Sequence, residues 1–312
     1  MRKFLIACSL GAVATFGLFS CGQHFFDDQD PEARMVQALQ EALVLGSRTA
    51  ADNLGNSSCT ASLQAVKGCT TGYLGNALVE ILVPDTVKNV LKGIKSFTNN
   101  VDKVISNLSP ETQYALNAAL NKTSYNAVSK LSEYGDSIRF ALNRGAEQAA
   151  PKSIDVFKDA ILGMSFSDAR GVLLGDGSAA TTYLHTTTYS GLQSAFAPII
   201  GGFLQKLNLD EFWGLIARNY NSFLSQYSNI RSISSALPEP AYSKGLPENL
   251  SKDLSEYATG KALDGLFTMV GKQETQLRAD PWGTVKALGG YLTDTVSELL
   301  GDVFSKAKNG SL

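Results

Sequence analysis

Residues 142–198 read LNRGAEQAAPKSIDVFKDAILGMSFSDARGVLLGDGSAATTYLHTTTYSGLQSAFAP and predict a tightly packed helical centre. Short helical segments in this stretch are separated by Pro151, Gly163 and the turn Gly175-Asp176-Gly177. Proline and glycine end or interrupt helices, because proline lacks a backbone N–H and glycine tolerates turn conformations. The helix faces between them carry mostly small or apolar side chains, which favours close helix–helix contact.

Helical patterning continues on both sides of this stretch. The clearest helix covers residues 87–108, where apolar side chains recur about every 3.6 residues. Further helices are expected over 32–45, from 110 onward, and over 128–142, 209–227, 250–277 and 285–304. Residues 76–83 fit either a strand or a short buried helix, because a brief apolar run does not distinguish the two. No alternating pattern of useful length competes, so the sequence predicts an all-α, bundle-like domain.

This helical domain is expected to cover residues 32–308, with a possible subdivision near residues 228–249. The latter segment is rich in serine and proline and predicts one long loop. Long loops in compact domains are often functional, so it is a candidate lid or partner-binding edge. A plain spacer fits the same composition.

Composition limits the function classes. The chain has 312 residues, of which 44% are hydrophobic and 18% charged, enough for a large core. Its formal net charge is -2 and it has no basic stripe, so no nucleic-acid partner is predicted. The sequence places no nucleophile beside a base and contains no metal-ligand cluster. We therefore assign no catalytic residue, no cofactor and no metal.

The N-terminus has the pattern of a bacterial lipoprotein signal peptide, residues 1–20. Arg2 and Lys3 form a positive region, and an apolar stretch follows that is short for a spanning helix. It ends in Leu18-Phe19-Ser20-Cys21, where the Cys21 thiol is the expected lipidation site. An ordinary secretory signal with an incidental Cys21 is the alternative. Stable anchoring takes more than one acyl chain, which lipoprotein modification supplies.

Residues 21–31 are expected to form the lipidated cysteine and a flexible tether of about 17 Å root-mean-square reach. Gly22 stands where lipoproteins kept in the inner membrane typically carry Asp. This predicts the outer membrane, with the domain facing the periplasm.

The cysteines that remain after Cys21 are Cys59 and Cys69. In an oxidising periplasm a disulfide is the natural interpretation. It closes a short loop poor in apolar residues and contributes about 3 kcal/mol by restricting the unfolded chain. A redox or metal site needs CxxC spacing or nearby His, which this loop lacks.

Four charged residues form the main candidate site. Arg144 and Glu147 are three residues apart on one predicted helix, and Lys261 and Asp264 have the same spacing on another. Each pair can close on itself, or all four can form one buried network that specifies the fold. The same groups are alternatively a site for a polar ligand.

Two further stretches carry weaker signals. Residues 175–178, Gly-Asp-Gly-Ser, fit a capped helix start better than an anion site, because no lysine follows and no strand precedes. His185 fits a packing residue better than a catalytic base, because no third group is placed to orient it. A hydrolase using His185, or the carboxylates of Asp159 and Asp168, is the least favoured hypothesis.

The central and C-terminal residues resemble a family of uncharacterised bacterial proteins, domain of unknown function 4197. The residues that carry the resemblance are Arg144 to Pro151, Phe157 to Met164, Asp168-Ala169, Leu173 to Gly175, Ala179 to Tyr183 and Lys261 to Phe267. The likeness extends from about Met35 to Phe304. It implies an all-helical, secreted or lipid-anchored protein and no particular reaction.

The sequence as a whole favours a non-enzymatic binding or interaction module held at an envelope membrane by its lipid. An envelope protein is its expected partner, and no oligomeric state is predicted. The alternative is a carrier of an apolar ligand or lipid between helices, suggested by the many Gly and Ala residues at central helix positions.

Overall fold

A computed structural model describes residues 31–60, 69–119, 128, 135–206, 209–233, 237–240, 242–246, 251–280, 283–284 and 301. The predicted signal peptide, Cys21 and most of the tether lie outside these residues, as does most of the predicted helix 285–304. The helices are α1 (Pro31–Gly55), α2 (Asp85–Ser106), α3 (Pro110–Ala119), α5 (Gly135–Ala149), α6 (Ser153–Leu162), α7 (Phe166–Leu174), α8 (Ala179–Lys206), α9 (Leu209–Ile233) and α10 (Ser251–Ala279), with 3-10 turns η2 (Ser57–Thr60) and η4 (Ala150–Lys152).

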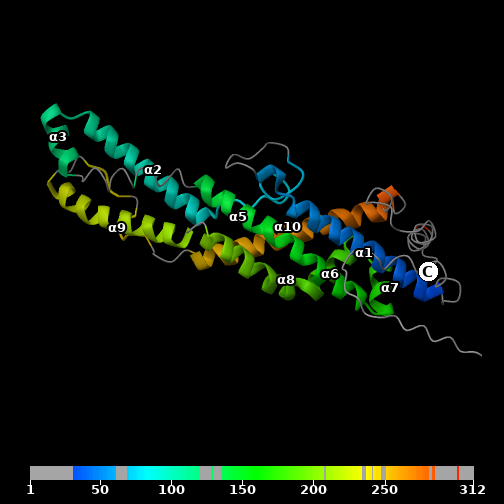
Figure 1. The fold of residues 1–312 in the computed structure, drawn as a ribbon. Coiled ribbons are helices and arrows are strands. Elements are labelled where there is room, and N and C mark those ends of the chain that lie inside the picture. Colours follow the sequence, from blue (N-terminus) through cyan, green and yellow to red (C-terminus); the bar gives the residue numbers. More distant parts are fainter. Residues whose placement is uncertain are drawn as a thin grey trace, which may run out of the picture.

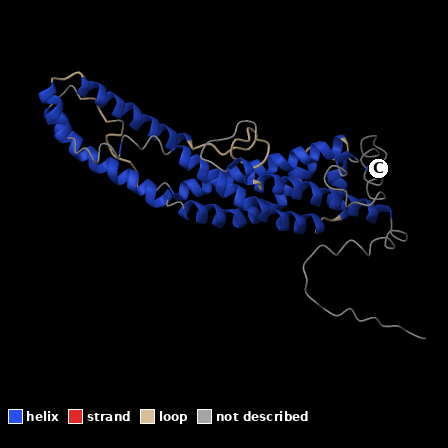
Figure 2. Ribbon diagram, turned by 45° about the horizontal axis from the view of Figure 1, so that its top comes forward, coloured by secondary structure: helices blue, strands red, loops and turns tan. Residues whose placement is uncertain are grey.

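The described chain is elongated and all-helical, and its described residues contain no strand (Figures 1 and 2). Helix α8 lies at the centre and packs against α5, α6 and α10, while α1 lies along α10 and α6. Helices α2, α3 and α9 extend the bundle at the end opposite α7 (Figure 1). None of the helices in the described ranges combines the length and apolar character needed to cross a bilayer.

Helices α8 and α10 run antiparallel in close contact. The carboxylate of Glu274 lies at the start of α8, and a Cβ atom at Gly201, near its end, would lie 3.3 Å from Oγ of Ser255. The missing side chain at Gly201 thus allows the two helices to approach closely.

A buried ion pair fixes the start of α8. Glu274 is 4% exposed and accepts hydrogen bonds from the backbone N–H groups of Ala180 (2.9 Å) and Thr181 (2.8 Å). Arg278 donates to the same carboxylate through Nε (2.9 Å) and to the carbonyl of Val172 at the end of α7 (2.8 Å). First-turn N–H groups have no partner within their own helix, and they carry partial positive charge. Helix α10 therefore caps α8 and joins it to α7.

Helix α1 runs antiparallel to α6. A Cβ atom at Gly55 would lie 2.9 Å from Cγ of Pro151 in η4, and the Gln40 side chain donates to the carbonyls of Ile161 (3.0 Å) and Leu162 (3.4 Å). The first turns of α1 therefore lie beside α7, and the two elements contact each other. Both occupy one end of the molecule (Figure 1).

The opposite end is held by aromatic side chains. Phe97 of α2 packs edge-on against Phe223 and Tyr227 of α9, with ring centroids 6.1 Å and 5.1 Å apart. The described part of the predicted loop 228–249 follows α9 closely: Asn221 accepts from and donates to the backbone of Leu246, at 2.8 Å and 3.2 Å. Residues 237–246 thus pack along α9.

The structure corrects several predicted boundaries. The helix over 87–108 is confirmed as α2, and the Ser109-Pro110 start as α3, where Ser109 Oγ accepts from the N–H of Thr112 (3.4 Å). Helix α1 does not end near Gly46 but continues to Gly55. Gly46 lies against Cβ of Gln273, so contact with α10 outweighs its low helix propensity.

Two other expectations were wrong in detail. Residues 76–83 form neither a strand nor a helix but turns and irregular backbone. Helix α9 continues to Ile233, past the expected end at 227. Both differences follow from tertiary contacts. Residues 76–83 form hydrogen bonds with α5, and α9 forms hydrogen bonds with the residues around Pro238.

We expect Glu274→Gln to lower the free energy of unfolding by about 3 kcal/mol, because it leaves Arg278 without its carboxylate and turns an amide NH2 toward the N–H groups of α8. Urea unfolding followed by circular dichroism measures the change. The matched control, Asp264→Asn on the exposed side of the same helix, should change stability by less than about 0.5 kcal/mol. Equal effects of the two variants would contradict this role of Glu274.

Candidate functional site

One face of α5 holds the irregular segment 72–82. Arg139, Asn143 and Glu147 follow each other at four-residue intervals, which places them on the same side of the helix. Each of them makes a hydrogen bond to this segment. Residues 72–82 have no regular secondary structure, and hydrogen bonds from these three side chains hold the segment in place.

Glu147 is the most buried charged group of the predicted site. It is 1% exposed, and its Oε1 accepts from the backbone N–H groups of Tyr73 (3.0 Å) and Leu74 (3.4 Å). Arg144 donates to Oε2 at 3.3 Å. A buried carboxylate is costly unless it is paired and hydrogen-bonded, and Glu147 has both kinds of partner. Arg144 and Glu147 thus pair with each other, which is one of the two arrangements that the sequence left open.

Asn143 and Arg139 hold the other end of the segment. The Asn143 amide accepts from the N–H of Ile81 and donates to its carbonyl, both at 2.8 Å. Arg139 donates through Nε to Glu80 at 2.7 Å. Asn143 is fully buried, so these bonds satisfy backbone groups that water does not reach.

Gly72 and Tyr73 connect this segment to the rest of the bundle. Gly72 has a φ of +69°, and a Cβ there would lie 2.7 Å from Oε1 of Glu147, so only glycine fits. The Tyr73 hydroxyl donates to the carbonyl of Ala262 in α10 at 2.7 Å. Burial, together with the Glu147 carboxylate, raises the pKa of Tyr73, so the hydroxyl remains a donor.

Lys261 and Asp264 do not join this cluster. Their side chains are 50% and 61% exposed, and they pair with each other at 2.8 Å. That hydrogen bond raises the pKa of Lys261. Their three-residue spacing does place both on one face of α10, but this face points to solvent. The hypothesis of one buried network of four charges is therefore wrong, and the residues form two separate pairs.

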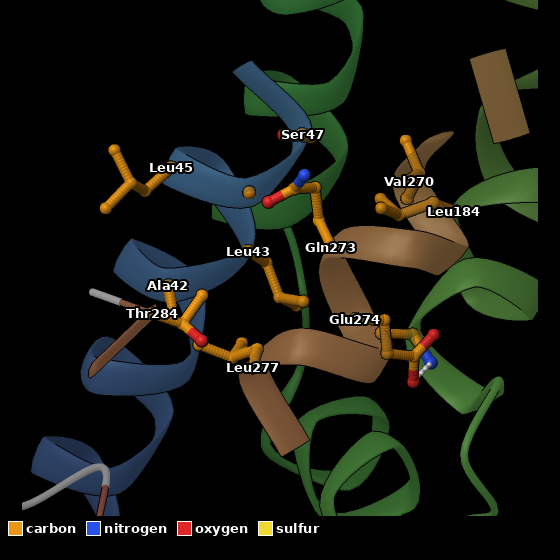
Figure 3. Close-up of a pocket in the computed structure, with 12 residues that line it drawn as sticks. Ala42, Leu43, Leu45, Ser47, Leu184, Val270, Gln273, Glu274, Leu277 and Thr284 are labelled. Carbon is orange, nitrogen blue, oxygen red and sulfur yellow. Dashed lines mark hydrogen bonds between the residues drawn. The ribbon is translucent and has the colours of Figure 1, made fainter. Parts of the chain in front are cut away.

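A small pocket opens between α1, α8 and α10 (Figure 3), and its accessible volume of about 20 Å³ has room for about one water molecule. Its walls are mostly apolar. The lining residues are Ala42, Leu43, Leu45, Gly46, Ser47, Ala180, Leu184, Val270, Gln273, Glu274, Leu277 and Thr284.

Gln273 is the unsatisfied polar group of this pocket. Its side chain reaches from α10 toward α1 (Figure 3), the residue is 8% exposed, and its buried Oε1 has no hydrogen-bond partner among the described residues. The neighbouring Glu274 already accepts from the start of α8. The pocket thus offers one free acceptor in an apolar wall, but it is far smaller than the pockets that hold small-molecule ligands.

The residues of the hydrolase hypothesis lack a catalytic arrangement. His185 is exposed on α8 and stacks near Tyr189 and Phe267, with ring centroids 5.0 Å and 4.6 Å away; no described residue forms a hydrogen bond with its ring. Asp168 instead caps α7 and accepts from the N–H (3.0 Å) and hydroxyl (2.6 Å) of Ser165. These bonds lower the pKa of Asp168, whereas a general acid needs a raised one.

The start of α8 is occupied by the chain itself. Asp176 accepts from the N–H (2.9 Å) and hydroxyl (2.8 Å) of Ser178, and Glu274 accepts from the N–H groups of Ala180 and Thr181. The predicted capped helix start at Gly175–Ser178 is confirmed. Within the described ranges, no group of three or more His, Cys, Asp or Glu side chains is placed to hold a metal ion.

The cysteine predictions are only partly covered. Cys69 is disulfide-bonded. Cys59 belongs to η2, but its side chain lies outside the described residues. The pairing of Cys59 with Cys69 therefore stays a prediction, and so does the lipidation of Cys21.

Fold and site together define an all-helical protein whose buried charges hold backbone segments in place. Residues 122–290, more than half of the chain, match the family described as "Protein of unknown function (DUF4197)", and the chain belongs to this family. The match is shorter than the expected range from Met35 to Phe304. No curated protein and no solved structure matches the chain.

Sequence reasoning missed Asn143, Glu274, Arg278 and Gln273 of these sites. Asn143 has a visible signal, because it precedes Glu147 by one helical turn. Glu274 and Arg278 have one too, as an acid–base pair four residues apart. Gln273 has none, since its unsatisfied Oε1 is a property of the assembled pocket.

We expect Glu147→Gln to free the segment 72–82, because the amide NH2 faces the N–H groups of Tyr73 and Leu74. Leu78 and Leu82 are 61% and 59% exposed, so chymotrypsin can report this opening by cleavage after either residue. Cleavage should become at least about tenfold faster, since it follows the population of the open form.

The matched control for this test is Asp155→Asn, an exposed acid on α6 that receives the same carboxylate-to-amide change. Its cleavage rate should equal that of the wild type. An unchanged rate for Glu147→Gln would contradict the proposed role of this carboxylate.

Proposed function

We propose that the protein is a lipid-anchored envelope protein whose helical domain faces the periplasm as a non-enzymatic interaction module. The observation that carries this proposal is the N-terminal sequence: a positive region, a short apolar stretch and Leu18-Phe19-Ser20-Cys21. Helix α1 begins at Pro31, ten residues after Cys21. Gly22 favours the outer membrane.

The hydrogen bonding of three carboxylates supports an interaction role. Glu147, Glu274 and Asp168 each accept backbone N–H groups of the chain itself. A catalytic carboxylate needs access to a substrate, whereas the oxygens of these three carboxylates already accept hydrogen bonds that stabilise the fold. An anchored domain meets its partners at raised local concentration, so shape and position suffice for this role.

Acylation of Cys21 is the decisive test. Expressed in a bacterium with lipoprotein processing, the wild-type chain should start at Cys21, carry acyl chains there by mass spectrometry, and stay with the membranes. Cys21→Ser should be unacylated and leave the membrane fraction, while Cys8→Ser, inside the signal, is the control that should behave as wild type. An unacylated wild-type protein that still carries residues 1–20 would contradict the proposal.

A carrier of an apolar ligand is the second candidate, suggested by the unpaired Oε1 of Gln273 in an apolar pocket that would have to widen to admit the ligand. The ligand would place an apolar body between α1 and α10 and donate one hydrogen bond to the free Oε1. A protonated fatty acid or a long-chain alcohol has this chemistry.

Mass spectrometry of organic extracts of the purified protein tests this candidate. We expect a retained ligand in the wild type and at least about tenfold less in Gln273→Leu, because the lost hydrogen bond is worth about 1 kcal/mol and the leucine also occupies ligand space. Gln276→Leu, on the exposed side of α10, is the matched control and should retain the ligand. An extract of the wild type without any ligand would contradict the carrier function.

A further inference from the structure

Helix α7 is apolar on two sides. Its inner side buries Ala169, Val172 and Leu173 in the core. On its outer side Phe166 and Leu174 are 38% and 45% exposed. A nine-residue surface helix normally has one apolar side, which faces the core, so the outer apolar side chains call for a separate explanation.

A further exposed apolar side chain stands at the adjoining end of α6. Phe166, Arg170 and Leu174 follow at four-residue intervals and lie on one side of α7. Leu162, the last residue of α6, is 57% exposed and is separated from α7 by a short turn. We call Leu162, Phe166, Arg170 and Leu174 the α7 corner.

The α7 corner lies at the end of the molecule at which α1 begins. Gln40 of α1 contacts the carbonyls of Ile161 and Leu162, so the preceding turns of α1 run past α7. Figure 1 shows the start of α1 and α7 at the same end, with α3 at the other. Cys21 is ten residues before Pro31, and ten residues span at most about 35 Å.

We propose that the α7 corner rests on the phospholipid bilayer to which Cys21 is anchored; this inference rests on the lipid anchor of the proposed function. Phe166, Leu162 and Leu174 enter the boundary between head groups and acyl chains, as apolar side chains of interfacial helices do. Arg170, exposed between them, pairs with lipid phosphates. The corner and the anchor then bind the same surface.

The charges around the corner fit a bilayer contact driven by apolar burial. Lys158 and Arg170 are exposed there together with Asp159 and Asp168, so the charge is mixed. Mixed charge gives little attraction to an anionic surface, and binding should therefore depend weakly on the fraction of anionic lipid. The anchor supplies the remaining binding free energy.

This contact sets the orientation of the whole molecule. With the α7 corner on the bilayer, the long axis leads away from the membrane and α3 lies at the distal end (Figure 1). Tyr114 of α3 is 80% exposed and would be far from lipid. The distal end is then the part offered to partners.

Photo-crosslinking of the full acylated chain tests the proposal. p-Benzoylphenylalanine is introduced in place of Phe166 or, as the matched control, in place of Tyr114, and the purified protein is reconstituted in phosphatidylethanolamine–phosphatidylglycerol vesicles. After illumination, intact-mass analysis should find about tenfold more phospholipid adduct at position 166 than at position 114. Halving the phosphatidylglycerol content should leave this ratio unchanged.

The outcomes separate this inference from the proposed function. Acylated protein with equal or no lipid adduct at position 166 overturns the α7 corner and leaves the anchor in place. An adduct at position 166 to a second protein chain also overturns it. Protein that carries no acyl chain on Cys21 overturns the proposed function, and this inference with it.

Discussion

A buried carboxylate that accepts backbone N–H groups from another segment is the interaction on which this fold depends. Glu274 does this for the first turn of α8, and Glu147 does it for Tyr73 and Leu74. Each is also paired with an arginine on its own helix. A charge in such a place is tolerated only with full pairing, so each glutamate fixes where its neighbouring segment lies.

These two constraints place the rest of the described chain. Glu274 holds α8 antiparallel to α10, and α8 then supports α5 and α6. Glu147 and Asn143 hold the irregular segment 72–82 along α5. These hydrogen bonds connect the first part of the chain to the central helices. Because α1 runs antiparallel to α6, the first turns of α1 lie beside α7. The direction of one helix thus decides which end of the molecule is nearest to any N-terminal anchor.

The sequence predicts the helical class and the positions of most helices, because amphipathic periodicity survives in stretches such as α2. It does not predict which charged face is buried. Arg144–Glu147 and Lys261–Asp264 have the same spacing, yet the segment 72–82 covers the first pair and solvent surrounds the second. Burial of this kind depends on contacts between residues far apart in the chain, and a single sequence does not contain them. Gln273 is hidden from sequence reasoning for the same reason.

Native-state hydrogen exchange at the start of α8 tests the central claim most directly. First-turn amides of a helix normally exchange fast, and those of Thr86 and Val87 in α2, whose Pro84 offers no side-chain cap, are the internal reference. If the carboxylate of Glu274 binds the N–H groups of Ala180 and Thr181, these amides should exchange only through large-scale opening of the bundle. Exchange of Ala180 and Thr181 as fast as that of Thr86 and Val87 would contradict the account.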